Sequence, residues 1–163
     1  MPTTSVVFFL FSMQFFCMDF FIQGQQQMHL TLIKNADTSA TLSYQVARTV
    51  YAQTGASSLS LVEAMTSMIK NISEKTGLTI SDIIRDKNIF DVLDEKSEHH
   101  ERIFVAANNR GFEMCLRTAR RMLANGLADR CFGATRFHSA DIIPQWALSR
   151  GYIADIDGFL FYL

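Results

Sequence analysis

The sequence is poor in the residues that cross-link a fold or hold a metal ion. It has three cysteines in 163 residues and no C-x-x-C pair, so neither a disulfide framework nor a cysteine metal site is predicted. Spacing leaves open whether Cys115 pairs with Cys131. The four histidines also lack the spacing of metal ligands. We therefore expect no metal site, and nothing in the composition implies a cofactor. The histidines are His29, His99, His100 and His138.

The sequence also lacks an excess of charge of either sign. Its 15 Lys and Arg residues oppose 16 Asp and Glu residues, which gives a formal net charge of −1. Because phosphate binding needs a basic excess or a clear basic face, we expect no nucleic acid partner. No repeat, low-complexity stretch or Gly/Pro-rich linker interrupts residues 37–163. We therefore treat this range as one domain.

The first 33 residues contain no Lys or Arg and hold seven of the 14 phenylalanines. Within them, residues 5–22 form an apolar run that would span about 27 Å as a helix, at the short end for crossing a bilayer. Three interpretations stay open: an imperfect signal peptide without a basic start, a membrane anchor, or a stretch that precedes a true start at Met28. Export or anchoring predicts a cell-envelope or periplasmic location with membrane association through residues 5–22. The third interpretation predicts a cytoplasmic one.

Helical periodicity predicts helices in the first two thirds of the domain, with capping residues before them and glycines after them. The charged stretch 85–102 is interpreted as a solvated loop and helix face. The predicted helices run from a cap among residues 37–39 to Gly55, from Ser57 or Ser58 to near Gly77, over residues 80–85, and over residues 111–125 with Gly126 as the stop.

After Gly126 the chain turns to short segments rich in aromatic and β-branched residues, which predict strands. These segments are residues 131–138, 152–156 and 159–163. Helices followed by a small antiparallel sheet make an α+β fold.

Four blocks stand in a fixed order along this domain: ARTVYAQ at 47–53, GATRFH at 133–138, PQW at 144–146 and IDGFLFY at 156–162. In order and spacing they resemble the SleB-type cell-wall hydrolase family, the spore-cortex-lytic enzymes and their relatives. The segment CLRTARR at 115–121 resembles the proteobacterial members. The resemblance covers about residues 40–163, and four ordered blocks are more specific than one short motif.

The resemblance implies a lysozyme-like α+β domain whose substrate is the glycan strand of peptidoglycan, cleaved between N-acetylmuramic acid and N-acetylglucosamine. It also implies one essential Glu that acts as general acid and base, with the sugar itself supplying the nucleophile. This scheme differs from the two carboxylates of most glycosidases. A Glu in an apolar pocket can hold a proton near neutral pH because burial raises its pKa.

Gln53 stands where the family pattern A-R-T-[IV]-Y-[GA]-E has its catalytic Glu. An amide donates hydrogen bonds but cannot cycle a proton at physiological pH. General acid catalysis, typically worth about 10²- to 10⁴-fold, should therefore be lost from this position. Because Gln is nearly isosteric with Glu, the fold should survive the change.

Other motifs depart from the family in the same direction. Arg136 replaces the first His of G-A-T-H-Y-[HY], and Phe159 replaces the His of I-G-x-H-x-F-Y. The resemblance leaves four candidates for substrate contact: Tyr51, Thr135, His138 and Trp146. Burial tendencies alone favour a core role for Trp146, and they leave His138 open between a structural role and ligand contact.

Two other acids are candidates to replace the missing carboxyl group. Asp91 is new relative to the family and is expected beside the cleft. Glu63 lies early in the second helix, where an acid also suits the helix dipole.

The sequence thus predicts a cell-wall hydrolase-like protein that acts on or binds peptidoglycan, with activity weak or lost. The alternative is an inert protein that binds peptidoglycan or a partner.

Overall fold

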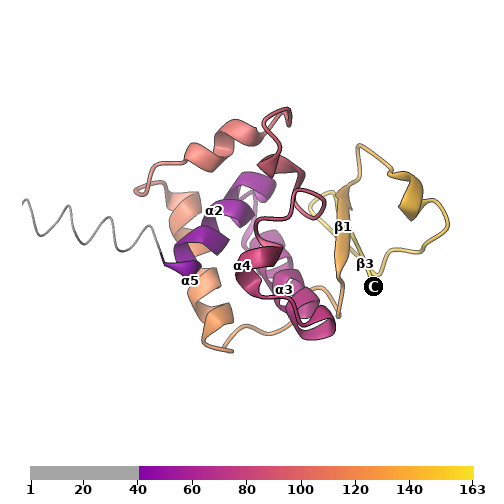
Figure 1. Cartoon of the computed structure of the whole chain (residues 1–163), viewed down its shortest axis with the longest axis horizontal. Coiled ribbons are helices and arrows are strands. Elements are labelled where there is room, and N and C mark those ends of the chain that lie inside the picture. Colours follow the sequence, from indigo (N-terminus) through magenta and orange to yellow (C-terminus); the bar gives the residue numbers. More distant parts are fainter. Residues whose placement is uncertain (1–40) are drawn as a thin grey trace, which may run out of the picture. The chain divides into compact units, whose positions relative to one another are not determined.

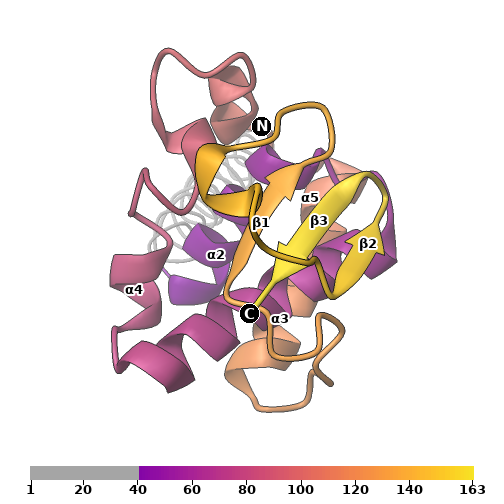
Figure 2. The same cartoon turned by 90° about the vertical axis from the view of Figure 1, so that its right-hand side faces the viewer.

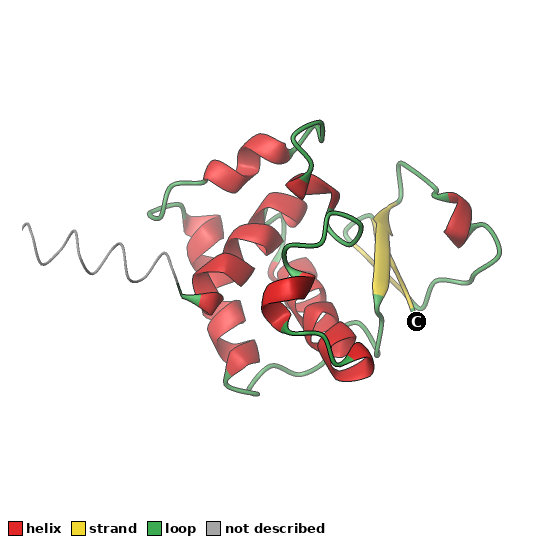
Figure 3. Ribbon diagram, in the orientation of Figure 1, coloured by secondary structure: helices red, strands yellow, loops and turns green. Residues whose placement is uncertain are grey.

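Helices fill the first part of the described chain, and three short strands with one 3₁₀ turn between them, η3 (Gln145–Ala147), fill its end (Figure 3). The structure is a computed structural model that describes residues 41–163. The apolar segment 1–33 and the predicted domain start at residue 37 lie outside the described residues. Within residues 41–163, no helix is both long enough and apolar enough to cross a membrane.

The first two described helices end where glycines predict. Helix α2 (Leu42–Thr54) stops at Gly55, and α3 (Leu59–Thr76) stops at Gly77. Both glycines adopt the left-handed conformation, with φ of 61° and 75°. Ser58 caps α3 as predicted, since its side chain accepts a hydrogen bond from the Leu61 N–H.

The predicted cap of α2 among residues 37–39 is wrong. Thr41 is the N-cap, and its carbonyl oxygen accepts the N–H groups of Tyr44 and Gln45 at 3.0 and 3.1 Å. Its side chain makes no capping hydrogen bond. The helix therefore begins at Leu42, later in the sequence than a cap among residues 37–39 predicts.

Three short elements separate α3 from the last helix. Helix α4 (Ile80–Ile83) covers most of the predicted helix 80–85. The charged stretch that follows contains two 3₁₀ turns, η1 (Asp91–Leu93) and η2 (His100–Phe104). Figure 1 shows this stretch beside α2, and both turns contact that helix.

The last helix, α5 (Arg110–Leu123), is terminated by an asparagine rather than by the predicted Gly126. Asn125 is the residue in the left-handed conformation, with φ of 56°. The Asn125 N–H donates to the Met122 carbonyl, and the Gly126 N–H donates to the Arg121 carbonyl at 2.8 Å. This pair of bonds is a Schellman motif, in which Asn can take the place of Gly.

The apolar core forms where α2, α3 and α5 pack together. The rings of Tyr44 and Phe112 meet edge to face, with centroids 4.8 Å apart. Both described cysteines are free thiols in this core. Burial raises the pKa of the Cys115 thiol to about 12 and that of Cys131 further, so both remain neutral packing groups.

The three strands form one antiparallel sheet in the order β1-β3-β2 (Figure 2). The strands are β1 (Arg136–Ser139), β2 (Ala154–Ile156) and β3 (Phe159–Tyr162). Asp157 and Gly158 join β2 to β3 with φ of 50° and 76°, the two positive values of a type I′ hairpin turn. The predicted order of helices followed by a small antiparallel sheet is confirmed.

The first strand is shorter than predicted because residues 131–135 form a turn. The Asp129 carboxylate accepts the N–H of Cys131 at 2.9 Å and that of Gly133 at 2.6 Å. Phe132 and Gly133 both have positive φ, which no strand permits. The side-chain acceptor at Asp129 thus replaces a strand ladder with a local turn.

Asp129→Asn should destabilise the fold, because an amide cannot accept both N–H groups with the strength of a carboxylate. Burial alone raises the pKa of Asp129, but the hydrogen bonds from Cys131 and Gly133 outweigh it and hold the pKa below its usual value. Ionisation therefore stabilises the folded chain fully above the unfolded pKa of about 3.9. That contribution is lost as pH falls through the lower folded pKa.

Urea unfolding at pH 7 should show the Asp129→Asn variant less stable than the wild type by about 1 kcal/mol. At pH 3 the difference should shrink. Asp155→Asn, a change at an exposed carboxylate on β2, is the matched control and should move stability by less than about 0.5 kcal/mol. A gap that is constant with pH would contradict this role of the Asp129 charge.

Candidate functional site

Three hollows lie along the boundary between the helices and the sheet, and we call them together the groove. Their volumes are about 540, 210 and 490 Å³. We call them the first, middle and third hollows. The first and middle hollows share Gln53, Asp91, Ser139 and Ile142. The middle and third hollows share Asn88, Ile89, Phe137 and Trp146. An extended polymer fits such a shape better than a compact small molecule does.

Gln53 lies where the first and middle hollows meet. It sits in the last turn of α2, and its residue surface is only 7% exposed. Its amide oxygen Oε1 is buried and has no hydrogen-bond partner in the described chain. Burying a polar atom without a partner costs about 1–3 kcal/mol. This oxygen is therefore a buried, unsatisfied acceptor beside the groove.

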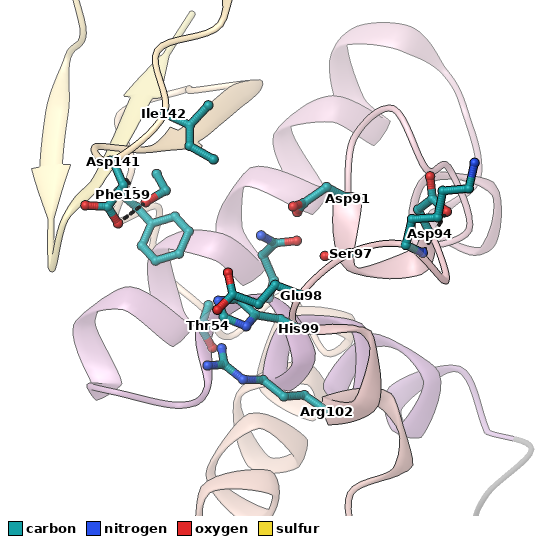
Figure 4. Close-up of a pocket in the computed structure, with 13 residues that line it drawn as sticks. Thr54, Asp91, Asp94, Ser97, Glu98, His99, Arg102, Asp141, Ile142 and Phe159 are labelled. Atoms are coloured by element: carbon teal, nitrogen blue, oxygen red, sulfur yellow. Dashed lines mark hydrogen bonds between the residues drawn. The ribbon is translucent and has the colours of Figure 1, made fainter.

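Asp91 lines the same two hollows as Gln53. It is the first residue of the 3₁₀ turn η1, and it is exposed. Figure 4 shows its carboxylate directed into the first hollow, across from Ile142 and Phe159. The structure thus brings the candidate replacement acid into the same two hollows as Gln53.

His138 and Trp146 form the wall of the middle hollow. The His138 Nδ1 atom lies 2.7 Å from the Ser139 carbonyl oxygen. A carbonyl only accepts, so Nδ1 carries a proton, and in the neutral ring Nε2 accepts the Tyr162 hydroxyl at 2.8 Å. Trp146 packs edge to face on both rings, at 5.7 and 5.2 Å between centroids. With both nitrogens engaged, His138 acts as a fixed wall and leaves neither nitrogen free for proton transfer.

Thr135 lies at the far end of the groove, in the third hollow with Trp146. Its backbone N–H donates to the Tyr162 carbonyl at 2.8 Å. Five of the seven predicted site residues therefore share the groove. They are Gln53, Asp91, Thr135, His138 and Trp146.

Tyr51 and Glu63 line none of the three hollows. Tyr51 packs on the Phe112 ring of α5, with centroids 6.3 Å apart. Residues two apart on a helix face different sides, so Tyr51 points away when Gln53 points into the groove. Glu63 is 7% exposed and pairs with Arg121 at 2.9 Å and with Arg130 at 3.2 Å. That ion pair ties α3 to α5 and to the loop that follows α5.

Sequence reasoning missed most of the remaining groove lining. The charged stretch 85–102, interpreted as solvated, contributes Asp94, Glu98 and Arg102 to the first hollow. The segment after β1 adds Asp141 and Ile142. A cluster of charges directly after the new acid Asp91 was the available signal. Within residues 41–163, no group of three His, Cys, Asp or Glu residues is arranged to hold a metal ion.

Comparisons with known proteins give a fold relative and no close sequence relative. No protein-family model and no curated protein matches the sequence. Among solved structures, the crystal structure of the catalytic domain of the Bacillus cereus SleB protein matches with a TM-score of 0.55 and 19% identity. The match covers 74% of this chain and 88% of that chain. The fold of the described residues is thus similar to that of the SleB catalytic domain, which is lysozyme-like, and the predicted fold class is confirmed.

Gln53→Met should stabilise the free protein, because it removes the buried oxygen that lacks a partner and fills nearly the same volume. Chemical unfolding should show a gain of about 1 kcal/mol in the free energy of unfolding. The control is Gln145→Met, at an exposed glutamine outside the three hollows, which should leave stability nearly unchanged. A loss of stability in Gln53→Met would indicate that the amide already makes bonds that the fold needs.

Proposed function

We propose that this chain binds the glycan strands of peptidoglycan in the groove and cleaves them weakly or not at all. The observation that carries the proposal is the place of Gln53. The residue that stands for the family's Glu lines the groove, is nearly buried and presents an amide oxygen without a partner. The ancestry is that of a cell-wall hydrolase, supported by the four sequence blocks and by the fold.

Binding is favoured by the chemistry of the groove wall. Trp146 offers a half-buried ring, and Ser139, Asn88 and Thr135 offer hydrogen-bonding groups along the hollows. Sugars are bound by this combination of aromatic faces and polar side chains, because each ring presents both C–H surfaces and hydroxyl groups. The buried oxygen of Gln53 fits an acetamido N–H or a hydroxyl of an amino sugar.

Cleavage requires a proton at the leaving glycosidic oxygen, and Gln53 has none to transfer. Asp91 is the acid that shares both hollows with Gln53. Because Asp91 is exposed, it lacks the apolar surroundings in which a glycosidase places its general acid. We therefore assign the chain a binding role first, with the hydrolase activity of its ancestry weak or lost.

Action on peptidoglycan requires that the domain reach the outer side of the cytoplasmic membrane. The apolar run 5–22 is the segment that would export or anchor it. Membrane association through this run is part of the proposal. A cytoplasmic product that begins at Met28 would need another partner for the groove.

The experiment compares the full-length wild type with Gln53→Glu on purified peptidoglycan, and measures both co-sedimentation and released muropeptides. We expect both proteins to co-sediment. Gln53→Glu should release muropeptides about 10²- to 10⁴-fold faster than the wild type. Burial should raise the pKa of the new carboxyl group, so the activity should fall as pH rises through that pKa.

The other outcomes of this experiment separate an active enzyme, an inert binder and a protein that does not bind peptidoglycan. Efficient release by the wild type, abolished in Asp91→Asn, would overturn the assignment as a weak or inert enzyme and make Asp91 the acid. Binding by both proteins without release by either leaves the inert-binder alternative, in which the groove has lost more than one carboxyl group. If neither protein co-sediments with peptidoglycan, the proposed function is wrong.

A further inference from the structure

The two ends of the groove carry opposite charge. The first hollow is lined by four carboxylates, with Lys96 and Arg102 as its Lys and Arg residues. The third hollow is lined by Lys75 and Arg136 and by no Asp or Glu. The carboxylates of the first hollow are Asp91, Asp94, Glu98 and Asp141. A ligand that spans the groove therefore meets a negative end and a positive end.

Arg136 holds its charge in place without a carboxylate partner. Its guanidinium carbon lies 5.5 Å from the centre of the Trp146 ring, a cation–π distance that orients the side chain. Arg136 belongs to none of the ion pairs of the described chain. At the first position of β1, its backbone is fixed opposite Tyr162. The guanidinium thus keeps its N–H donors free for a ligand anion.

Lys75 supplies the second cation from a different element. It lies in the last turn of α3, and its Nζ donates to the Gly133 carbonyl at 2.8 Å. One hydrogen bond leaves two of the three ammonium donors for other acceptors. The neighbouring acid, Glu74, pairs with Lys70 and does not line the third hollow. Asn88 and Thr135 add an amide and a hydroxyl donor there, whereas the Thr76 hydroxyl already donates to the Ile72 carbonyl at 2.7 Å.

We propose that the third hollow is a carboxylate-binding subsite, in which Arg136 and Lys75 hold an anionic substituent of the polymer bound along the groove. The inference rests on the proposed function. On peptidoglycan the matching groups are the free carboxylates of the peptide side chains, which project from the glycan at regular intervals. The opposite charge of the first hollow would repel the same groups, so the two ends together favour one register of the peptide-bearing sugars along the groove.

The test measures binding of the full-length protein to two forms of peptidoglycan. One form is native, and in the other the peptide carboxylates have been converted to neutral amides. Wild type should bind the amidated form about 3- to 10-fold more weakly than the native form, a range set by a partly exposed, charge-assisted contact. Arg136→Gln and Lys75→Gln should each weaken binding to the native form and leave binding to the amidated form unchanged.

Arg120→Gln is the matched control, because Arg120 is exposed on α5 and lies outside the three hollows. It carries the same change of net charge and should bind both forms like the wild type. Equal binding of the wild type to native and amidated peptidoglycan would overturn the subsite while the proposed function stands. Equal weakening by Arg136→Gln and Arg120→Gln would also overturn it, since only net charge would then matter. No binding to either form would instead reject the proposed function.

Discussion

The packing of α2 against its neighbours is the constraint on which the rest of the structure depends. This helix contacts α3, α4, α5 and the 3₁₀ turns η1 and η2, and its Val46 and Val50 are fully buried. Since side chains on a helix repeat every 3.6 residues, burial of this apolar face also fixes the direction in which the remaining side chains of α2 point. Gln53 is thereby directed into the groove with its amide oxygen unpaired. The free energy that holds this oxygen away from water comes from the packing of the core.

The sheet provides the opposite wall of the groove through a small network of hydrogen bonds and rings. His138, Tyr162 and Trp146 hold one another, with the Tyr162 hydroxyl on the His138 ring and the Trp146 ring against both. Trp146 in turn orients Arg136. These aromatic residues stabilise the sheet by their packing, and they also shape the wall of the groove. The two interpretations of His138 and Trp146, structural or ligand-facing, are compatible because a groove wall must be rigid to be selective.

Features encoded by local chemistry could be predicted from the sequence. Gly55 and Gly77 end helices because their conformation is a property of the residue itself, and the order of helices before strands follows from side-chain periodicity. The strand predicted from residue 131 failed because one acceptor, Asp129, redirects the backbone there. The groove lining from residues 94–102 and 139–142 could not be predicted, because these segments meet only through tertiary packing. Tyr51 was placed in the site by its motif, although helix geometry directs it to the other face from Gln53.

Trp146 is the single tryptophan of the chain, and it lines the middle and third hollows. Its fluorescence therefore reports directly whether the groove is occupied. The most direct test of the account is a fluorescence titration of the full-length protein with soluble, uncross-linked glycan strands of peptidoglycan. Occupation of the groove should produce a saturable change in Trp146 emission with the same affinity as co-sedimentation. Co-sedimentation with peptidoglycan at unchanged Trp146 emission would place the binding surface elsewhere and contradict the account.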